Sequence, residues 1–204
     1  GRIRGEHAVE LAVTGLRTTI VGALVERLKA SGMPVNPQSI GGDLADPTCE
    51  LSIPEARRYV LAAGVLFGKR LGNLTAQQIN VTLAVNLLNP VRICEAILER
   101  QADARICVIG SLSGIRGSFD ECYAVSKAGL HGYVQFRETK WPQQLFAVAP
   151  SIISDSGMTM RRPDYPEILT KRSTVTAARV AEVIHEHLWD NAAEVLTNSV
   201  VVVK

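Results

Sequence analysis

Three residues in the second half of the chain could carry acid–base chemistry: Ser111, Tyr123 and Lys127. Tyr123 and Lys127 are four residues apart, so on a helix their side chains lie on the same face, one turn from each other. A phenol has a pKa of about 10, and a neighbouring ammonium group favours the phenolate. We therefore expect Lys127 to lower the pKa of Tyr123 toward neutrality. Ser111 follows an apolar run at 106–109, where a hydroxyl donor could stabilise negative charge on a carbonyl oxygen.

The spacing Tyr-x-x-x-Lys is weak evidence by itself, because surface helices produce such pairs by chance. The surrounding sequence is more specific: residues 109–114 read Ile-Gly-Ser-Leu-Ser-Gly, and residues 123–129 read Tyr-Ala-Val-Ser-Lys-Ala-Gly. These segments resemble the serine strand end and the catalytic helix of the short-chain dehydrogenase/reductase family, and the resemblance extends over about 9–203. It implies an oxidoreductase that moves hydride between a nicotinamide cofactor, NAD(P), and a small-molecule carbonyl or alcohol substrate.

The resemblance gives each catalytic candidate a role. Tyr123 is the acid or base, Ser111 orients the substrate, Lys127 tunes the pKa and contacts the ribose, and Asn86 relays protons through water. Pro90 is consistent with the last role, because proline has no N–H and the carbonyl of Asn86, four residues earlier, loses its helical partner. Alternatively, Pro90 only kinks the helix and has no bearing on a proton relay through Asn86.

The resemblance also implies that residues at several places along the chain contact the cofactor. Residues 43–44 resemble the pair that contacts adenine, residues 62–64 stand where the family has Asn-Ala-Gly, and residues 148–150 form the strand end beside the nicotinamide, although Ser151 replaces the usual glycine. The expected cofactor-binding residues are Gly15, Arg17, Thr18, Thr19, Ile20, Asp43, Leu44, Ala62, Ala63, Gly64, Tyr123, Lys127, Pro150, Ile153 and Thr159.

The expected phosphate-binding turn departs from the family pattern. Such a turn needs glycines so that the backbone can approach the pyrophosphate. Here Thr19 and Val21 replace the second and third glycines, and both are β-branched. Either the loop widens and the hydroxyls of Thr18 or Thr19 reach phosphate with Arg17 supplying charge, or Val21 and its neighbours fill the phosphate site. The sequence leaves both outcomes open.

Two functional alternatives follow from this departure. The protein could be a family member that has lost cofactor binding and serves as a binding or scaffolding subunit, or a non-redox enzyme that reuses Tyr123 and Lys127, because a fold does not fix a reaction. If cofactor binds, NADP is favoured. Residues 35–39 lack the acidic residue that would hold a ribose 2′-hydroxyl, and Arg17 could approach a 2′-phosphate.

Apolar runs alternate with segments of helical period, which is typical of βα units around a parallel sheet. We therefore expect an α/β fold, a Rossmann-like doubly wound parallel sheet with helices on both faces. The expected strands are 9–13, 33–35, 59–62, 106–109, 145–149 and 200–203. The expected helices are 22–31 closed by Gly32, one that begins after Thr75 and is interrupted by Pro90, 123–140, and one around 180–188. No helix fits after the second strand, so the second crossover is shortened.

Residues 151–173 are polar and contain two prolines, which predicts a mobile substrate loop within one domain over 1–204. Arg161, Arg162, Lys171 and Arg172 in this segment could meet an anionic substrate, although a solvated loop is the simpler interpretation. On the helix after Lys127, His131 is expected to pack in the core or at an interface.

The composition of the chain limits which partners and which cellular compartment we expect. With 22 basic and 20 acidic side chains the net charge is +2, so nucleic acid is not expected as a partner. No segment reaches the length of a membrane span, residues 1–6 do not begin a signal peptide, and the four cysteines have no C-x-x-C spacing. We expect a cytoplasmic protein without a metal site, and the resemblance implies a homodimer or homotetramer paired through helices at 75–100 and 123–140.

Overall fold

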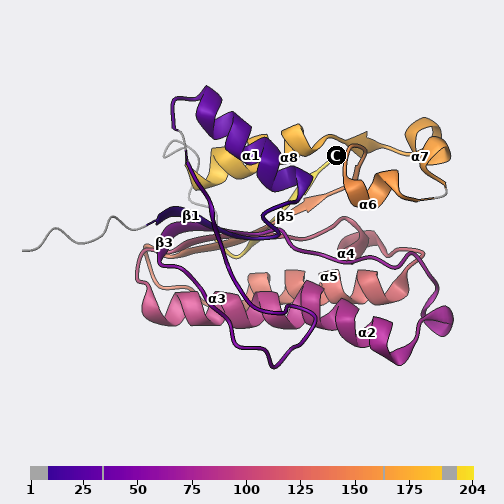
Figure 1. Cartoon of the computed structure of the whole chain (residues 1–204), viewed down its shortest axis with the longest axis horizontal. Coiled ribbons are helices and arrows are strands. Elements are labelled where there is room, and N and C mark those ends of the chain that lie inside the picture. The colour runs from indigo at the N-terminus through magenta and orange to yellow at the C-terminus, as the bar shows by residue number, and fades with distance from the viewer. Residues whose placement is uncertain (1–8, 34, 163, 190–196) are drawn as a thin grey trace, which may run out of the picture.

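The structure is a computed structural model that describes residues 9–33, 35–162, 164–189 and 197–204. Its centre is a six-stranded parallel sheet with the order β2-β1-β3-β4-β5-β8 (Figure 1). The strands are β1 Val9–Thr14, β2 Gln38–Ser39, β3 Ala56–Leu61, β4 Arg105–Ile109, β5 Gln144–Pro150 and β8 Ser199–Val203. The strand order reverses at β1, which makes the sheet doubly wound and confirms the expected Rossmann-like fold.

Helices cover both faces of this sheet (Figure 1). Helices α1 (Thr19–Ala30) and α8 (Ala177–Leu188) lie on one face. The other face carries α2 (Ala76–Leu83), the π-helical turn η2 (Ala84–Leu88), α3 (Asn89–Arg100) and α5 (Glu121–Phe136). Gly32 follows the last turn of α1 with a positive φ of 77°, which is the helix-ending conformation expected for this glycine.

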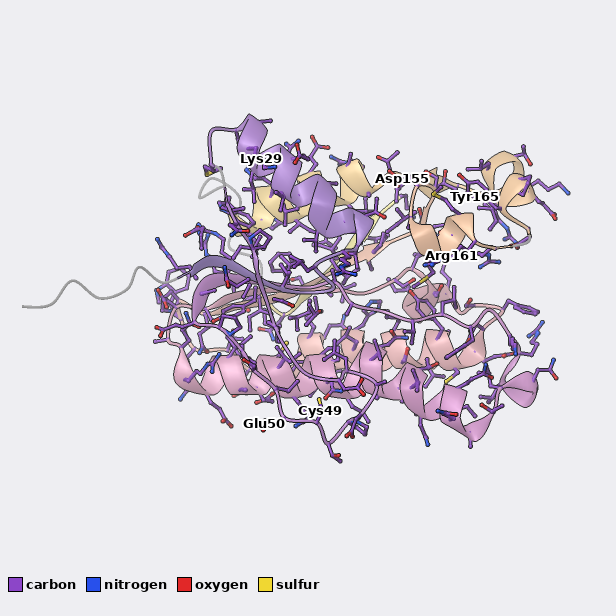
Figure 2. All side chains as sticks on the ribbon, in the orientation of Figure 1. Lys29, Cys49, Glu50, Asp155, Arg161 and Tyr165 are labelled. Atoms are coloured by element: carbon purple, nitrogen blue, oxygen red, sulfur yellow. The ribbon has the colours of Figure 1, made fainter. Side chains whose placement is uncertain are left out.

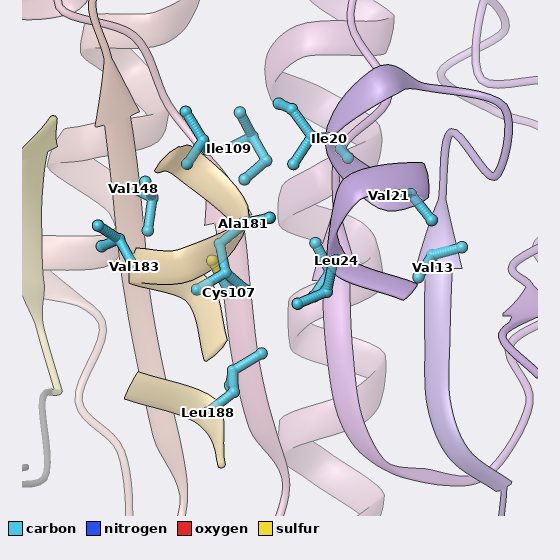
Figure 3. Packing of buried hydrophobic residues seen from close by; sticks show 14 of the residues in the cluster. Val13, Ile20, Val21, Leu24, Cys107, Ile109, Val148, Ala181, Val183 and Leu188 are labelled. Atoms are coloured by element: carbon cyan, nitrogen blue, oxygen red, sulfur yellow. The ribbon is translucent and has the colours of Figure 1, made fainter. Parts of the chain in front are cut away.

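Each face has its own apolar core, because successive strand residues point to opposite sides. Leu11 belongs to the cluster under α1 and α8, whereas its neighbour Ala12 belongs to the cluster under α3 and α5. Figure 3 shows the first cluster, in which Val13, Leu24 and Val148 are completely buried. Packed helices therefore cover both faces of the sheet, and the ends of its strands are left open to a ligand.

The second strand does not lie at 33–35 as expected. It is the two-residue β2, whose Gln38 and Ser39 pair with Ala12 and Val13 of β1. In sequence the expected strand contains a proline at 34, which lies outside the described residues, and a second proline follows at 37; proline cannot donate a hydrogen bond to a neighbouring strand. From β2 the chain reaches β3 without a helix, which confirms the shortened second crossover.

The helix containing Pro90 is not interrupted, contrary to expectation. Residues 76–100 form one continuous helix in which η2 supplies a π-helical turn just before Pro90. There the N–H of Asn89 donates to the carbonyl of Ala84, five residues earlier. This wider turn lets the chain pass the residue that has no N–H without breaking the helix.

This continuous helix is long and apolar enough to cross a membrane, with a mean hydropathy of 1.4 in its most apolar window. However, 56% of that window is buried inside the protein, where the helix packs against α5 and the sheet. Its apolar character is thus accounted for by core packing.

Residues 151–173 contain more regular structure than a polar loop. The segment holds β6 (Ile152–Ile153), α6 (Gly157–Met160) and α7 (Tyr165–Lys171), and β7 (Thr174–Val175) follows and pairs with β6. These elements have two to seven residues each, too few to show an apolar period in the sequence. Two further short helices, η1 (Leu71–Asn73) and α4 (Ser113–Arg116), were likewise not expected.

Candidate active site

A cavity of about 730 Å³ lies at the carboxyl ends of the strands, where parallel sheets bind their ligands. Its walls come from the β1–α1 turn, the ends of β3, β4 and β5, and the segments around α4, α6 and α7. In Figure 1, α4 and α6 lie at the same end of the molecule, on opposite sides of the sheet. The expected site residues that line the cavity are Arg17, Thr18, Thr19, Ile20, Ala62, Ala63, Gly64, Ser111, Tyr123, Lys127, Pro150, Ile153 and Thr159.

The start of α5 sets the position of Tyr123. Asp120 caps the helix by accepting a hydrogen bond from the N–H of Tyr123 at 2.9 Å, and its other oxygen accepts from the N–H of Gly68 at 2.9 Å. Helix α5 therefore begins at Glu121, and it ends at Phe136 rather than at the expected residue 140. One turn after Tyr123, Lys127 lies on the same face of the helix.

Lys127 is buried and anchored to the end of β4. Its side chain is 4% exposed, and Nζ donates to the carbonyl of Ile109 at 2.7 Å. Nζ lies 5.8 Å from the centre of the Tyr123 ring. Burial lowers the pKa of Lys127 to about 8, because desolvation disfavours the ammonium form.

The pKa of Tyr123 is raised, which corrects the expectation that Lys127 lowers it. Burial is the largest cause, and the Asp120 carboxylate acts in the same direction. The neighbouring Ser111 hydroxyl lowers the pKa of Tyr123 but does not offset burial. The ammonium of Lys127 is turned toward Ile109, so it does not reverse the effect. In this arrangement Tyr123 carries its proton and can act as a donor.

His131 holds the backbone of Ser111, a contact that sequence reasoning missed. The ring Nε2 accepts a hydrogen bond from the N–H of Ser111 at 3.2 Å. Burial and the charge of Lys127 lower the pKa of His131 to about 4, which keeps Nε2 free to accept. A Cβ at Gly110 would overlap Nε2, so this close approach requires glycine. The only sequence signal is that His131 lies one turn after Lys127.

Asn86 is completely buried and does not line the cavity. Its side-chain amide exchanges two hydrogen bonds with the backbone of Val65, both 2.9 Å long. Asn86 therefore fixes the chain just after β3. A Cβ at Gly64 would lie 3.4 Å from Asn86 Oδ1 and 4.0 Å from Lys127 Nζ, so the amide, the glycine and the lysine are close neighbours.

The β1–α1 turn places Val21 away from the cavity, whereas its neighbours Thr19 and Ile20 line it. Gly15 has φ of 70°, and a Cβ there would lie 2.8 Å from the backbone nitrogen of Ala63. Val21 is 1% exposed and packs in the core beneath α1, as Figure 3 shows, so it does not fill the cavity. Thr18 caps α1 by accepting from the N–H of Val21 at 3.4 Å, which leaves its own O–H free to donate. Thr19 lines the cavity.

Asp43 and Leu44 do not line the cavity, and neither does Gly15. Asp43 accepts from the N–H of Ala45 at 3.1 Å, and the carbonyl of Leu44 accepts from the side chain of Asn89 at 2.9 Å. The two residues thus form a turn that is held on α3. Their expected adenine contact stays a prediction.

Among the described residues no group of three His, Cys, Asp or Glu side chains could hold a metal ion. Cys94, Cys107 and Cys122 are buried, Cys49 is partly exposed, and all four are free thiols. Burial raises the pKa of Cys94, Cys107 and Cys122, so none of these three thiols is activated as a thiolate.

Comparison with known proteins agrees with this geometry. The family model for short chain dehydrogenases matches residues 59–166, which is more than half of the chain and runs from the middle of β3 past the end of α5. The protein belongs to the short-chain dehydrogenase family. No curated protein matches the sequence.

Solved structures of the family share the fold of this short-chain dehydrogenase. A short chain dehydrogenase family protein from Francisella tularensis is 14% identical with a TM-score of 0.77, over 96% of this chain and 97% of that one. The 3-alpha-hydroxysteroid dehydrogenase from Pseudomonas sp., solved with NADH, is 19% identical with a TM-score of 0.72, over 95% and 94%. An actinorhodin polyketide ketoreductase variant, solved with NADPH, is 18% identical with a TM-score of 0.73, over 96% and 95%.

Proposed function

We propose that this protein is an NAD(P)-dependent oxidoreductase that reduces a carbonyl or oxidises an alcohol of a small molecule, with Ser111, Tyr123, Lys127 and Asn86 as its catalytic set. The observation that carries the proposal is the meeting of Ser111, Tyr123 and Lys127 in one cavity, with Nζ of Lys127 5.8 Å from the centre of the Tyr123 ring. A serine donor beside a protonated phenol is what a carbonyl oxygen needs as negative charge develops on it.

The residues around the β1–α1 turn fit a dinucleotide. Gly15 lets the turn approach the end of β3, the first N–H groups of α1 are available to a phosphate, and Thr18 and Thr19 supply hydroxyls at the same place. These residues would hold the pyrophosphate together with Arg17 and Ile20. Residues 62–64, Pro150, Ile153 and Thr159 would hold the nicotinamide half, and Asp43 and Leu44 the adenine. The bound cofactor supplies or accepts hydride at the substrate carbon.

The chain's own groups carry the proton. In the reducing direction Tyr123 donates its phenolic proton to the substrate oxygen, and Ser111 donates a hydrogen bond to that oxygen. Lys127 and Asn86 stand behind Tyr123, where the lysine ammonium stabilises the phenolate that results and the carbonyl of Asn86 passes protons onward through water. In the oxidising direction each transfer is reversed.

The preference for NADP is supported by Arg17. Its guanidinium is exposed at the cavity, and within the described part of the chain it forms no ion pair. A 2′-phosphate bound there would gain a charge-assisted bond that a 2′-hydroxyl would not.

The decisive experiment is the variant Tyr123→Phe, assayed with NADPH and a panel of carbonyl compounds. Removing the proton donor is expected to lower turnover by at least about 100-fold. The circular dichroism spectrum should stay unchanged, because the phenyl ring keeps its packing. Undiminished turnover in this variant, or no NADPH binding to the native protein at millimolar concentration, would refute the proposal. The second result would favour a scaffolding subunit.

We also propose a cytoplasmic homodimer or homotetramer. The four free thiols support a reducing compartment. Exposed apolar side chains on the outer helices support self-association, namely Val125 and Phe136 on α5 and Leu88 on η2.

A further inference from the structure

The cavity that holds Ser111 and Tyr123 is far more basic than the whole chain. The chain has 22 basic and 20 acidic side chains, whereas the described residues of the cavity wall include a single acid, Asp164. Besides Lys127, the basic residues of this wall are Arg17, Arg116, Arg161, Arg162, Arg172 and Lys204. Like charges gathered in one cleft repel one another and attract anions from solution. The uneven distribution therefore indicates an anionic ligand.

Besides Arg17, three of these arginines have no carboxylate partner among the described residues. Arg162 forms a two-bond ion pair with Asp164, at 2.9 and 2.7 Å, so its charge is already matched. Arg116 and Arg172 are exposed, and within the described residues their side chains make no hydrogen bond or ion pair. Arg161 donates only to the carbonyl of Gly157 in its own helix, at 2.8 Å. Three guanidinium groups are thus available to a ligand.

Arg116 lies at the end of the short helix α4, which begins two residues after Ser111. It is the last residue of α4, five residues after Ser111, and Gly117 with φ of 82° follows it. Helix α4 is pressed against α5 so closely that a Cβ at Gly114 would lie 2.8 Å from the backbone of Lys127. The place from which Arg116 reaches into the cavity is therefore set by the same helix that carries the catalytic residues.

Arg161 and Arg172 come from a different wall. Arg161 follows α6, as labelled in Figure 2, and Arg172 follows α7. Both line the same cavity as Arg116. Arg17, in contrast, belongs to the β1–α1 turn, next to the first N–H groups of α1. The basic residues thus come from three walls of one cavity: the β1–α1 turn, α4 beside Ser111, and the segments that follow α6 and α7.

We infer that the substrate carries an acidic group, a carboxylate or a phosphate, which Arg116 binds together with Arg161 and Arg172 while the reacting carbon lies at Ser111 and Tyr123. This inference rests on the proposed function and narrows its substrate to a class. A guanidinium group suits this task because its fork of N–H donors matches the oxygens of both anions. Arg17 stays with the cofactor end of the cavity.

The test compares ketones that differ only in an acidic group: levulinate with its methyl ester for the carboxylate, and dihydroxyacetone phosphate with dihydroxyacetone for the phosphate. Dissociation constants are measured by calorimetry with NADP+ present at saturation, because the oxidised cofactor has no hydride to give and the ketone is bound without being reduced. At least one acidic ketone should bind about tenfold more tightly than its neutral partner. The preference should shrink as salt is added, because exposed charges are screened.

The variants Arg116→Gln and Arg172→Gln should abolish this preference without changing the NADPH dissociation constant. Lys171→Gln is the matched control, since Lys171 adjoins Arg172 in sequence but pairs with Glu167 and does not line the cavity. The inference is overturned if neither acid is preferred or bound, or if Arg116→Gln weakens NADPH instead. Failure of the proposed function has a different signature, namely turnover that survives Tyr123→Phe, so the two results can be told apart.

Discussion

His131 positions Ser111 through the unprotonated edge of its ring, although it does not line the cavity. In His131→Leu the N–H of Ser111 loses its acceptor inside the protein, which costs about 1–3 kcal/mol. We expect kcat to fall by about tenfold with an unchanged NADPH dissociation constant. His131→Gln, which offers an amide oxygen, should restore part of the loss. Equal kcat values for His131→Leu and the native enzyme would contradict this role.

The same histidine should give the fold a measurable sensitivity to acid. The pKa of His131 is about 4 in the folded protein and 6.5 ordinarily, so between these values the unfolded chain binds the extra proton. Stability from this group is complete above pH 6.5 and is lost as the pH falls toward 4, by about 3 kcal/mol. Urea unfolding across this range should show a smaller loss in His131→Leu than in the native protein.

Lys127 illustrates a conflict between stability and catalysis. Its pKa is about 8 in the folded protein and 10.5 ordinarily, so between these values the unfolded chain again holds more protons and stability rises with pH. Lys127→Met should therefore raise the free energy of unfolding at pH 7 by about 2 kcal/mol, after allowance for the lost bond to Ile109, and should abolish turnover. The exposed Lys29→Met is the control, and a destabilised Lys127→Met would refute the argument.

At the scale of elements, the β1–α1 turn depends on Gly15. In Gly15→Ala the new Cβ meets the backbone of Ala63, and alanine disfavours the positive φ. We expect a loss of about 1–3 kcal/mol in unfolding free energy and weaker NADPH binding, because the turn must move away from the end of β3. Gly22→Ala is the control: it lies within α1 with nothing near its Cβ, and it should stabilise the protein by about 0.5–1 kcal/mol.

The elements that could be predicted from sequence are those with long apolar patterns. Strands β3, β4 and β5 and helix α8 lie within a few residues of their expected places, because burial on one or both faces imposes a period. Strand β2 and helices α4, α6 and α7 were missed because elements of two to seven residues have no period to read. The expected break at Pro90 failed for another reason, since η2 absorbs the proline within a continuous helix.

The site shows the same division. That Ser111, Tyr123 and Lys127 line one cavity could be predicted, because they form a local pattern close together in sequence. The contact of His131 with Ser111 spans 20 residues, and the grouping of Arg116 with Arg172 depends on how α4 and α7 face each other across the cavity. No spacing in the sequence encodes such distances. The direction of the Tyr123 pKa shift could not be predicted from the sequence either, because it depends on how deeply the phenol is buried.

At the scale of the whole molecule, two cores share one sheet, so they should unfold together. Leu24→Ala in the first core and Ile97→Ala in the second should each cost about 2–5 kcal/mol, since both side chains are completely buried. Each variant should still show a single transition by circular dichroism and by tryptophan fluorescence. Leu71→Ala, at an exposed site, should change stability by about 0.5 kcal/mol or less. Two separate transitions in either core variant would contradict this view.

The π-helical turn η2 has a consequence for insertions and deletions. A π-helical turn contains one residue more than an α-helical turn, so removing one residue from Ala84–Leu88 would restore a regular helix. Because the extra residue is absorbed inside this turn, the two halves of the helix would keep their orientation, and Thr82 on one side and Ile93 and Ile97 on the other would stay buried. Removing one residue from α2 or α3 instead would rotate the two halves against each other by about 100°, because no extra residue is present there to absorb the loss. A single deletion within Ala84–Leu88 should therefore be tolerated better than a deletion elsewhere in this helix.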